Sequence, residues 1–458
     1  MEWREQRGSE CPRCGALKVA IFLRGSADCG LARREPDMSL SPTFIARCNS
    51  VADVSADYLA GHLRQVHDGA ELAPKVAVQL LRCDDEVLSE LLATARALKE
   101  QYHPGIITYS RKVFIPLTNL CRDYCGYCTY RRDPGEHGAH TMTPDEVLSI
   151  AKHGETLGCT EALFSLGDRP EALFPEMRET LRQLGYRSTL HYLEAMCELV
   201  LHETRLLPHA NPGLLSANWI ERLRASNPSL GLMLESTSTD LVAAHPAGHA
   251  PDKVPVLRLR TIEDAGKLGV PFTTGILIGI GETMEDRVDS LLAIKRLHQQ
   301  YGHIQEIIVQ NFRVKPRIPM AAWPEPDTGD MLRTLAVARL LLRDMNIQAP
   351  PNLTENGYER LLEGGINDWG GVSPLTPDYI NPEAPWPHLL ELQRRTAAAG
   401  QKLVQRLPVY PEFVDKVAER GGLLGQRLRE LSTAGQAGWA GAAEQDAGKL
   451  KQSRSLAG

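Results

Sequence analysis

An apolar, strand-like run passes directly into three closely spaced cysteines in Val113–Cys128, which reads VFIPLTNLCRDYCGYC. The C-x3-C-x2-C spacing puts three thiols on one short loop. Each thiolate can bind one iron of a 4Fe-4S cluster, which usually takes four cysteines. The iron that lacks a protein ligand is then open to S-adenosylmethionine (SAM), bound through its amino and carboxylate groups. The sequence therefore predicts Cys121, Cys125 and Cys128 as iron ligands and SAM as the source of a 5'-deoxyadenosyl radical.

Two other interpretations of these cysteines stay open. Zinc commonly takes four ligands, and His137, His140 or Cys159 could supply the fourth. Alternatively, the three thiols are buried without a ligand. Tyr127, directly before the last cysteine, favours the cluster, because an adenine ring beside the cluster needs an apolar face.

Outward from this loop, strand-like and helix-like segments alternate. The expected strands are Val113–Leu117, Glu161–Leu166, Leu206–Ala210, Leu230–Glu235, Phe272–Ile278, Ile304–Val309 and Gln348–Asn352. The expected helices include Pro144–Leu157, Pro175–Gly185, His191–Glu203, Met284–Tyr301 and Gly329–Met345. Thr143 and Thr283, each followed by early acids, are typical helix N-caps. The βα order predicts an α/β fold with a parallel sheet, closed into a full or partial TIM-type barrel; a doubly wound open sheet is the alternative.

The expected domain order has five parts. Residues 1–75 form a poorly ordered extension, in which Cys11, Cys14, Cys29, Cys48, His62 and His67 fit no regular zinc finger. A helical lead-in (76–112) precedes the barrel (113–400). A C-terminal helical segment (401–430) leads into a disordered tail (431–458), which is rich in Ala, Gly, Gln and Lys.

Composition narrows the function. The 458 residues are 43% hydrophobic and 24% charged, with a net charge of −6, which indicates neither a nucleic acid nor an anionic membrane as partner. No apolar run approaches the roughly 18 residues of a transmembrane helix, and the N-terminus lacks an apolar signal core. Ten cysteines without a signal peptide indicate thiols or metal ligands in a reducing compartment, so we expect a cytoplasmic protein.

The cysteine loop resembles that of the radical SAM superfamily, in which an aromatic residue precedes the third cysteine. The run Ile107–Lys112, continuing through Pro116–Leu120 into the cysteines, resembles one branch, the 7,8-didemethyl-8-hydroxy-5-deazariboflavin (FO) synthase family of the CofG type. The likeness extends from about residue 80 to about residue 390. It implies a radical SAM barrel that holds a 4Fe-4S cluster and SAM.

The resemblance also implies site residues at the ends of the strands. For SAM these are Tyr127 beside adenine, Gly167, Asp168 and Glu171 near the amino group, Glu235 at the ribose, and Gly275, Gly279 and Glu282 in a G-x-I-x-G-x-x-E pattern. For substrate they are His209, Asn211, Asn311, Asn367, Asp368 and Trp369. The opposing interpretations are ordinary βα turns, a solvated strand end at Glu235, a structural histidine at His209 and a plain turn at 367–369. No catalytic acid or base is predicted.

Family membership would imply cyclisation of a 5-amino-5-(4-hydroxybenzyl)-6-(D-ribitylimino)-5,6-dihydrouracil adduct to FO, the chromophore of coenzyme F(420), with loss of ammonia. This is carbon-nitrogen lyase chemistry. A partner radical SAM enzyme would make the adduct from tyrosine and 5-amino-6-(D-ribitylamino)uracil, and a one-electron donor would reduce the cluster. Two alternatives remain: the chain is that partner enzyme, or it is a non-catalytic zinc-binding scaffold.

Overall fold

The computed structural model describes residues 55–244, 250–354 and 357–438. Cys11, Cys14, Cys29 and Cys48 therefore lie outside the described residues, as do residues 439–458 of the expected tail. Residues 55–75 of the expected N-terminal extension are described, and they contain the helix α1 and the start of α2.

Eight parallel strands form a closed barrel, because β1 pairs with β8 on one side and with β2 on the other. The ninth strand, β9, also runs parallel to β1 and pairs with its N-terminal half, Ile106–Ser110. The strands are β1 (Ile106–Thr118), β2 (Glu161–Leu166), β3 (Leu207–Asn211), β4 (Ser229–Gly231), β5 (Phe272–Ile278), β6 (Ile304–Asn311), β7 (Ile347–Gln348), β8 (Asp368–Val372) and β9 (Lys402–Arg406). The predicted closed barrel is confirmed, and the open sheet is excluded.

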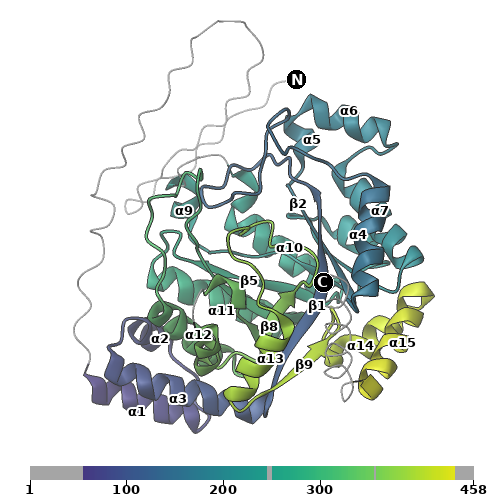
Figure 1. Cartoon of the computed structure of the whole chain (residues 1–458). Coiled ribbons are helices and arrows are strands. Elements are labelled where there is room, and N and C mark those ends of the chain that lie inside the picture. The colour runs from purple at the N-terminus through teal and green to yellow at the C-terminus, as the bar shows by residue number, and fades with distance from the viewer. Residues whose placement is uncertain (1–54, 245–249, 355–356, 439–458) are drawn as a thin grey trace, which may run out of the picture. The chain divides into compact units, whose positions relative to one another are not determined.

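Helices follow the strands and cover the outside of the barrel (Figure 1). Before β1 come α1 (Ala56–His67), α2 (Pro74–Leu81) and α3 (Asp85–Tyr102). Between β1 and β8 in the chain come α4 (Pro144–Thr156), α5 (Pro170–Leu173), α6 (Pro175–Gln183), α7 (Thr189–Glu203), α8 (Ala217–Leu223), α9 (Thr239–Ala244), η2 (Pro251–Lys253), α10 (Pro255–Lys267), α11 (Met284–Tyr301), α12 (Thr328–Leu342), η3 (Pro351–Leu353) and η4 (Tyr358–Gly364). After β8 come α13 (Leu389–Ala398), α14 (Pro411–Ala418) and α15 (Gly422–Gly438).

The two predicted helix caps are confirmed. The side chains of Thr143 and Thr283 each accept a hydrogen bond from the backbone N–H three residues on. The carboxylate of the acid at that position in turn accepts from the backbone N–H of the threonine. These reciprocal bonds satisfy N–H groups that the first turn of a helix leaves without partners. They fix where α4 and α11 begin after their βα loops.

The segment after β9 closes the N-terminal end of the barrel. The carbonyl oxygen of Pro408 accepts hydrogen bonds from Ser229 at β4 and Gln305 on β6. The Tyr410 hydroxyl bonds Glu306, also on β6. Beyond it, α14 and α15 bury apolar side chains against Leu201 and Leu207. These contacts hold residues 407–410 across this end of the barrel. Among the helices of the described ranges, none has the length and apolar character to cross a bilayer.

Candidate active site

One cavity of about 350 Å³ runs through the interior of the barrel. Its upper wall includes the three predicted cluster cysteines, and its lower wall includes Arg406 and Pro408. Lys112 lines the lower part of the cavity, and Thr118, six residues further along β1, lies where the strand ends before the cysteine loop. At roughly 3.3 Å per strand residue, the lower and upper ends of the cavity are therefore about 20 Å apart. A space of this length can hold two small molecules placed end to end.

The cysteine loop is held at its base by backbone contacts. Leu120 forms a bridge with Arg132, and the Tyr130 hydroxyl donates to the Thr118 carbonyl at 2.9 Å. Gly167, at the end of β2, packs directly beneath the loop, since a Cβ there would lie 1.9 Å from the Leu120 carbonyl oxygen. Any larger residue at this position would displace the loop, which explains the glycine without a direct contact to a cofactor.

The three sulfurs do not gather as ligands of one ion. Four thiolates around one zinc, at about 2.3 Å each, lie roughly 3.8 Å apart. Within the described chain, the group of three His, Cys, Asp or Glu side chains whose ligand atoms all lie within 4.8 Å of one another consists of three aspartates, not the three cysteines. Burial raises the pKa of the Cys121 thiol to about 12.

The fourth zinc ligands considered above do not come to this loop. Cys159 precedes β2 and is therefore at the opposite end of the barrel wall. His140 pairs with Glu146 at 3.1 Å, and His137 is an exposed residue outside the cavity lining.

Three buried aspartates, Asp123, Asp168 and Asp252, meet beside Cys121. Arg122 binds Asp252 through two nitrogens at 2.5 Å, and Arg169 bonds both Asp168 and Asp252. The Asp168 N–H donates to the Cys121 sulfur at 3.2 Å. Burial, with Asp252 nearby, raises the pKa of Asp168 to about 6. Asp168 therefore faces the upper cavity as an acceptor close to the cysteine loop.

Glu235 belongs to a half-buried ion pair in the same part of the cavity. Its carboxylate accepts from Lys253 at 2.7 Å and from the Tyr127 hydroxyl at 3.2 Å. Burial alone would raise the pKa of Glu235, but Lys253 and Arg258 outweigh it and hold the pKa below its usual value. Glu235 has a φ of 66°, a conformation that residues other than glycine seldom adopt. The ionised carboxylate is thus available to accept hydroxyl hydrogen bonds, and Lys253 is a half-buried cation that sequence reasoning missed.

Four residues predicted for cofactor binding do not line the cavity. Glu171 accepts from the backbone and the hydroxyl of Thr189, where α7 begins. Glu282 accepts from the N–H groups of Gly279 and Ile280 and from Arg287. Gly275 packs against β6, because a Cβ there would lie 2.0 Å from the Ile308 carbonyl oxygen. These residues shape the loops, and Leu277 is the part of the G-x-I-x-G-x-x-E segment that reaches the cavity.

The predicted substrate residues divide in the same way. His209, Asn211 and Asn311 line the cavity, and the Asn311 carboxamide oxygen is buried without a partner among the described residues.

Asn367, Asp368 and Trp369 are not in the cavity lining. They are on or beside strand β8, not on a loop over the barrel mouth. The Asn367 side chain bonds Arg339 and Asn346, and the Asp368 carboxylate bonds Arg406. Trp369 is fully buried and donates to Thr396 of α13 at 3.0 Å.

Sequence reasoning also missed the aromatic wall of the cavity. The rings of Phe114 and Trp386 stack with centroids 5.2 Å apart and an interplanar angle of 9°, and both residues line the cavity. Trp386 belongs to the irregular segment after β8, which also contributes Asp378 and Asn381. No pairing or periodicity marks this segment, so only the folded chain reveals its place.

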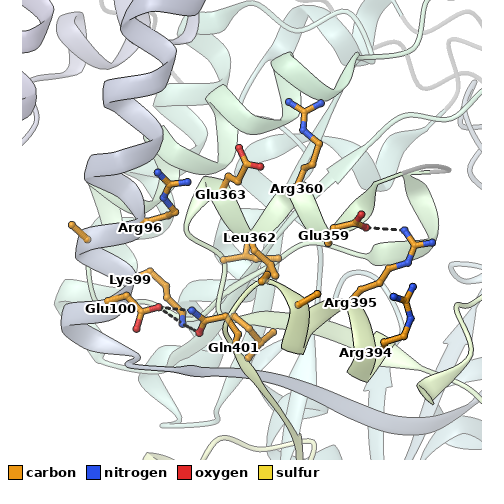
Figure 2. A pocket seen from close by; sticks show the side chains of 15 residues that line it. Arg96, Lys99, Glu100, Glu359, Arg360, Leu362, Glu363, Arg394, Arg395 and Gln401 are labelled. Carbon is orange, nitrogen blue, oxygen red and sulfur yellow. Dashed lines mark hydrogen bonds and ion pairs between the residues drawn. The ribbon is translucent and has the colours of Figure 1, made fainter. Parts of the chain in front are cut away.

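A second, wider hollow of about 910 Å³ lies outside the barrel, between α3, η4 and α13 (Figure 2). Several of its charged side chains are paired: Lys99 bonds Glu100 and Gln401, and Arg395 bonds Glu359. It opens at the N-terminal ends of β1 and β9, away from the cysteines. It therefore has no part in the chemistry of the cysteine loop.

Comparison with known proteins agrees with this geometry. Residues 115–294 match the family model of the radical SAM superfamily. A "7,8-didemethyl-8-hydroxy-5-deazariboflavin synthase" of Methanopyrus kandleri is 51% identical over 310 residues, which cover 68% of this chain and 93% of that protein. An "FO synthase" of Mycobacterium tuberculosis is 49% identical over 378 residues, which cover 79% of this chain. The match spans only 44% of the mycobacterial protein.

Solved structures share the fold. The FeFe-hydrogenase maturase HydG from Carboxydothermus hydrogenoformans has a TM-score of 0.63 at 19% identity, with 81% of this chain and 88% of that chain covered. Methylornithine synthase (PylB) has a TM-score of 0.61 at 20% identity, with 78% and 99% covered. At these identities the likeness supports the barrel and no more.

We expect Trp369→Ala to destabilise the whole protein instead of acting on a ligand. Removing a fully buried tryptophan side chain costs about 3–5 kcal/mol of unfolding free energy, which a lower urea midpoint would report. Trp386→Ala is the matched control, because Trp386 is only half-buried and should cost less. An unchanged midpoint in the Trp369 variant would contradict the buried position.

Proposed function

The chain belongs to the 7,8-didemethyl-8-hydroxy-5-deazariboflavin synthase family of the radical SAM superfamily, and we propose that it forms FO by radical cyclisation. The observation that carries this proposal is the combination of that family match with a closed eight-stranded barrel whose cavity is lined by three cysteines and by polar interior residues. The chain spans less than half the length of the mycobacterial relatives it matches. The activity, substrates and partners given below for this chain are therefore proposals.

Superfamily membership implies a 4Fe-4S cluster and SAM. When bound, they supply a 5'-deoxyadenosyl radical that abstracts hydrogen from the substrate. The proposed cluster ligands are Cys121, Cys125 and Cys128. Asp168 would accept from the amino group of SAM, Glu235 would accept from its ribose hydroxyls, and Leu277 and Tyr127 would contact adenine. Gly167, Gly275, Gly279, Glu171 and Glu282 would act by shaping the loops around these groups.

The proposed substrate is the ribityl-uracil adduct that carries a 4-hydroxybenzyl group, and the proposed products are FO and ammonia. The stacked rings of Phe114 and Trp386 offer an apolar face to the hydroxybenzyl or uracil ring. The unpartnered carboxamide oxygen of Asn311 can accept from a ring N–H. A partner radical SAM enzyme would deliver the adduct, and a one-electron donor in a reducing cytoplasm would supply the electron.

The proposal is tested by anaerobic incubation of the full chain with SAM, a reductant and the adduct, supplied directly or by a partner enzyme. We expect deazaflavin fluorescence and the mass of FO to appear together with 5'-deoxyadenosine. Formation of the adduct from tyrosine and 5-amino-6-(D-ribitylamino)uracil by this chain alone would assign it the partner reaction instead. SAM cleavage with neither product would contradict the substrate assignment and leave radical initiation standing.

We expect Cys121→Ala, Cys125→Ala and Cys128→Ala each to abolish the 4Fe-4S cluster, because each thiolate is proposed to hold one iron. Iron and acid-labile sulfide are measured after anaerobic reconstitution. Cys159→Ala and Cys197→Ala are matched controls, since both thiols are buried and lie outside the cavity lining. An intact cluster in one of the first three variants would remove that residue from the ligand set.

We expect Glu235→Gln to weaken SAM binding by about tenfold to a hundredfold while the cluster is retained. Loss of charge-assisted hydrogen bonds to the ribose costs about 1.5–3 kcal/mol. Glu171→Gln is the control: its carboxylate is used at the start of α7, so SAM affinity should not change. Equal affinities for SAM in wild type and Glu235→Gln would place Glu235 outside the cofactor site.

A further inference from the structure

The lower half of the barrel cavity is lined by charged and polar side chains. Barrel interiors are usually filled by branched apolar residues, and a buried charge is costly unless it is well paired. The residues here are Lys112, Glu161, His209, Glu306, Gln348 and Arg406, each no more than 8% exposed. We call this set the barrel floor.

Three residues of the barrel floor are occupied by other parts of the protein. Glu161 accepts from Ser110 and from Lys112. Glu306 accepts from Thr273, Tyr410 and Arg406. Arg406 donates to Asp368, Glu306 and the Leu407 carbonyl. These bonds tie β9 and the closing segment to the barrel and leave little capacity for a ligand.

Lys112, His209 and Gln348 have hydrogen-bonding capacity to spare. Within the described residues, the Lys112 ammonium makes one side-chain bond, to Glu161 at 2.8 Å, although it has three protons to donate. The Gln348 carboxamide and the His209 Nε2 atom have no hydrogen-bond partner in the same part of the chain, and both residues face the cavity. The floor therefore offers both donors and acceptors to a molecule in the cavity.

The tautomer of His209 follows from its neighbours. The Ser229 hydroxyl has one proton, and it donates this proton to the Pro408 carbonyl, which can only accept. Ser229 must then accept from His209 Nδ1, 2.7 Å away. Burial lowers the pKa of His209 to about 4, so the ring is neutral and Nε2 carries a lone pair. Gly231 leaves room on that side, because a Cβ there would lie 3.0 Å from Nε2.

The charges of the floor disfavour an anionic ligand. The Lys112 ammonium is matched by Glu161, whereas the Arg406 guanidinium faces two carboxylates, those of Glu306 and Asp368. Within the barrel floor the two cations are thus balanced by two carboxylates, and Asp368, which binds Arg406 from outside the cavity lining, adds a third. A phosphate placed here would meet no unmatched cation, but an uncharged chain of hydroxyl groups can donate to Nε2 and accept from Lys112.

We propose that the barrel floor is a pocket for an uncharged polyol chain, in which His209 Nε2 accepts from a hydroxyl, Lys112 donates to one, and Ser229 is a positioning residue for His209. This inference rests on the proposed function, under which the polyol is the ribityl chain of the substrate and of FO. The ribityl chain points down to the floor, and the ring system lies level with Phe114 and Trp386, next to the cofactor.

The test uses the fluorescence of FO bound to the full-length, cluster-loaded protein. Three probes are titrated: FO, its analogue with an n-pentyl chain in place of the ribityl chain, and its 5'-phosphate. We expect FO to bind about tenfold to a hundredfold more tightly than the pentyl analogue. We expect the 5'-phosphate to bind at least about tenfold more weakly than FO, because both cations of the floor are already matched by carboxylates.

Two variants locate the effect. His209→Leu removes the acceptor, so it should weaken FO binding by about threefold to tenfold and leave binding of the pentyl analogue unchanged. Ser229→Ala should shift FO binding in the same direction, because the ring can then take the other tautomer. The matched control is His303→Leu: His303 is also buried, with its pKa lowered by burial to about 4, but it lies outside the cavity lining. It should change neither affinity.

The outcomes separate this inference from the function on which it rests. Equal affinity of the wild-type protein for FO and the pentyl analogue would overturn the polyol pocket, as would an equal loss of both affinities in His209→Leu. If FO is formed in the enzymatic assay, the proposed function survives either result. If the wild-type protein neither forms nor binds FO, the proposed function fails and this inference fails with it.

Discussion

The structure depends on one strand, β1, which pairs with β8, β9 and β2 and thereby closes the barrel. Its 13 residues give it enough length to serve two levels of the molecule. The lower half, Ile106–Ser110, carries β9, and the upper half pairs with β2 and ends at the cysteine loop. Because one continuous strand carries both Lys112 and the residues that lead to Cys121, the floor and the mouth of the cavity are held at a fixed separation.

Because β9 and residues 407–410 cover the lower end of the barrel, charged side chains in its interior need partners within the protein. Arg406 would be an unpaired cation in a dry core if Asp368 and Glu306 did not accept from it, and an uncompensated buried charge destabilises strongly. The ion pairs therefore connect three strands that are far apart in sequence. They also place paired charges at the base of the cavity.

Much of the fold was predictable from sequence, because strands buried on both faces are apolar runs and because caps such as Thr283 mark helix starts. The boundaries of β5 and α11 agree with the prediction to the residue. Strands β8 and β9 were not predicted. Asp368–Val372 contains two glycines and an acid, and Lys402–Arg406 has two cations. Their strand pairing is decided by contacts with β1, which no local pattern expresses. Helices α1 and α2 lie within or across the border of a segment that was expected to be poorly ordered.

The site was predictable only where a residue type reveals its chemistry. Three cysteines at this spacing indicate a metal-binding loop by themselves, whereas the presence of a glutamate in a motif does not show which groups its carboxylate bonds. Glu282 and Glu171 bond backbone N–H groups of nearby loops, while Glu235 faces the cavity because its left-handed backbone turns it inward beside Lys253. Lys112 and Glu161 belong to no recognisable motif, and the buried charge of each is explained only by the ion pair that they form in the folded chain. What separates a structural from a ligand-binding polar side chain here is its remaining hydrogen-bonding capacity. That capacity depends on the full set of partners in the folded chain, so it cannot be read from the position of one residue in the sequence.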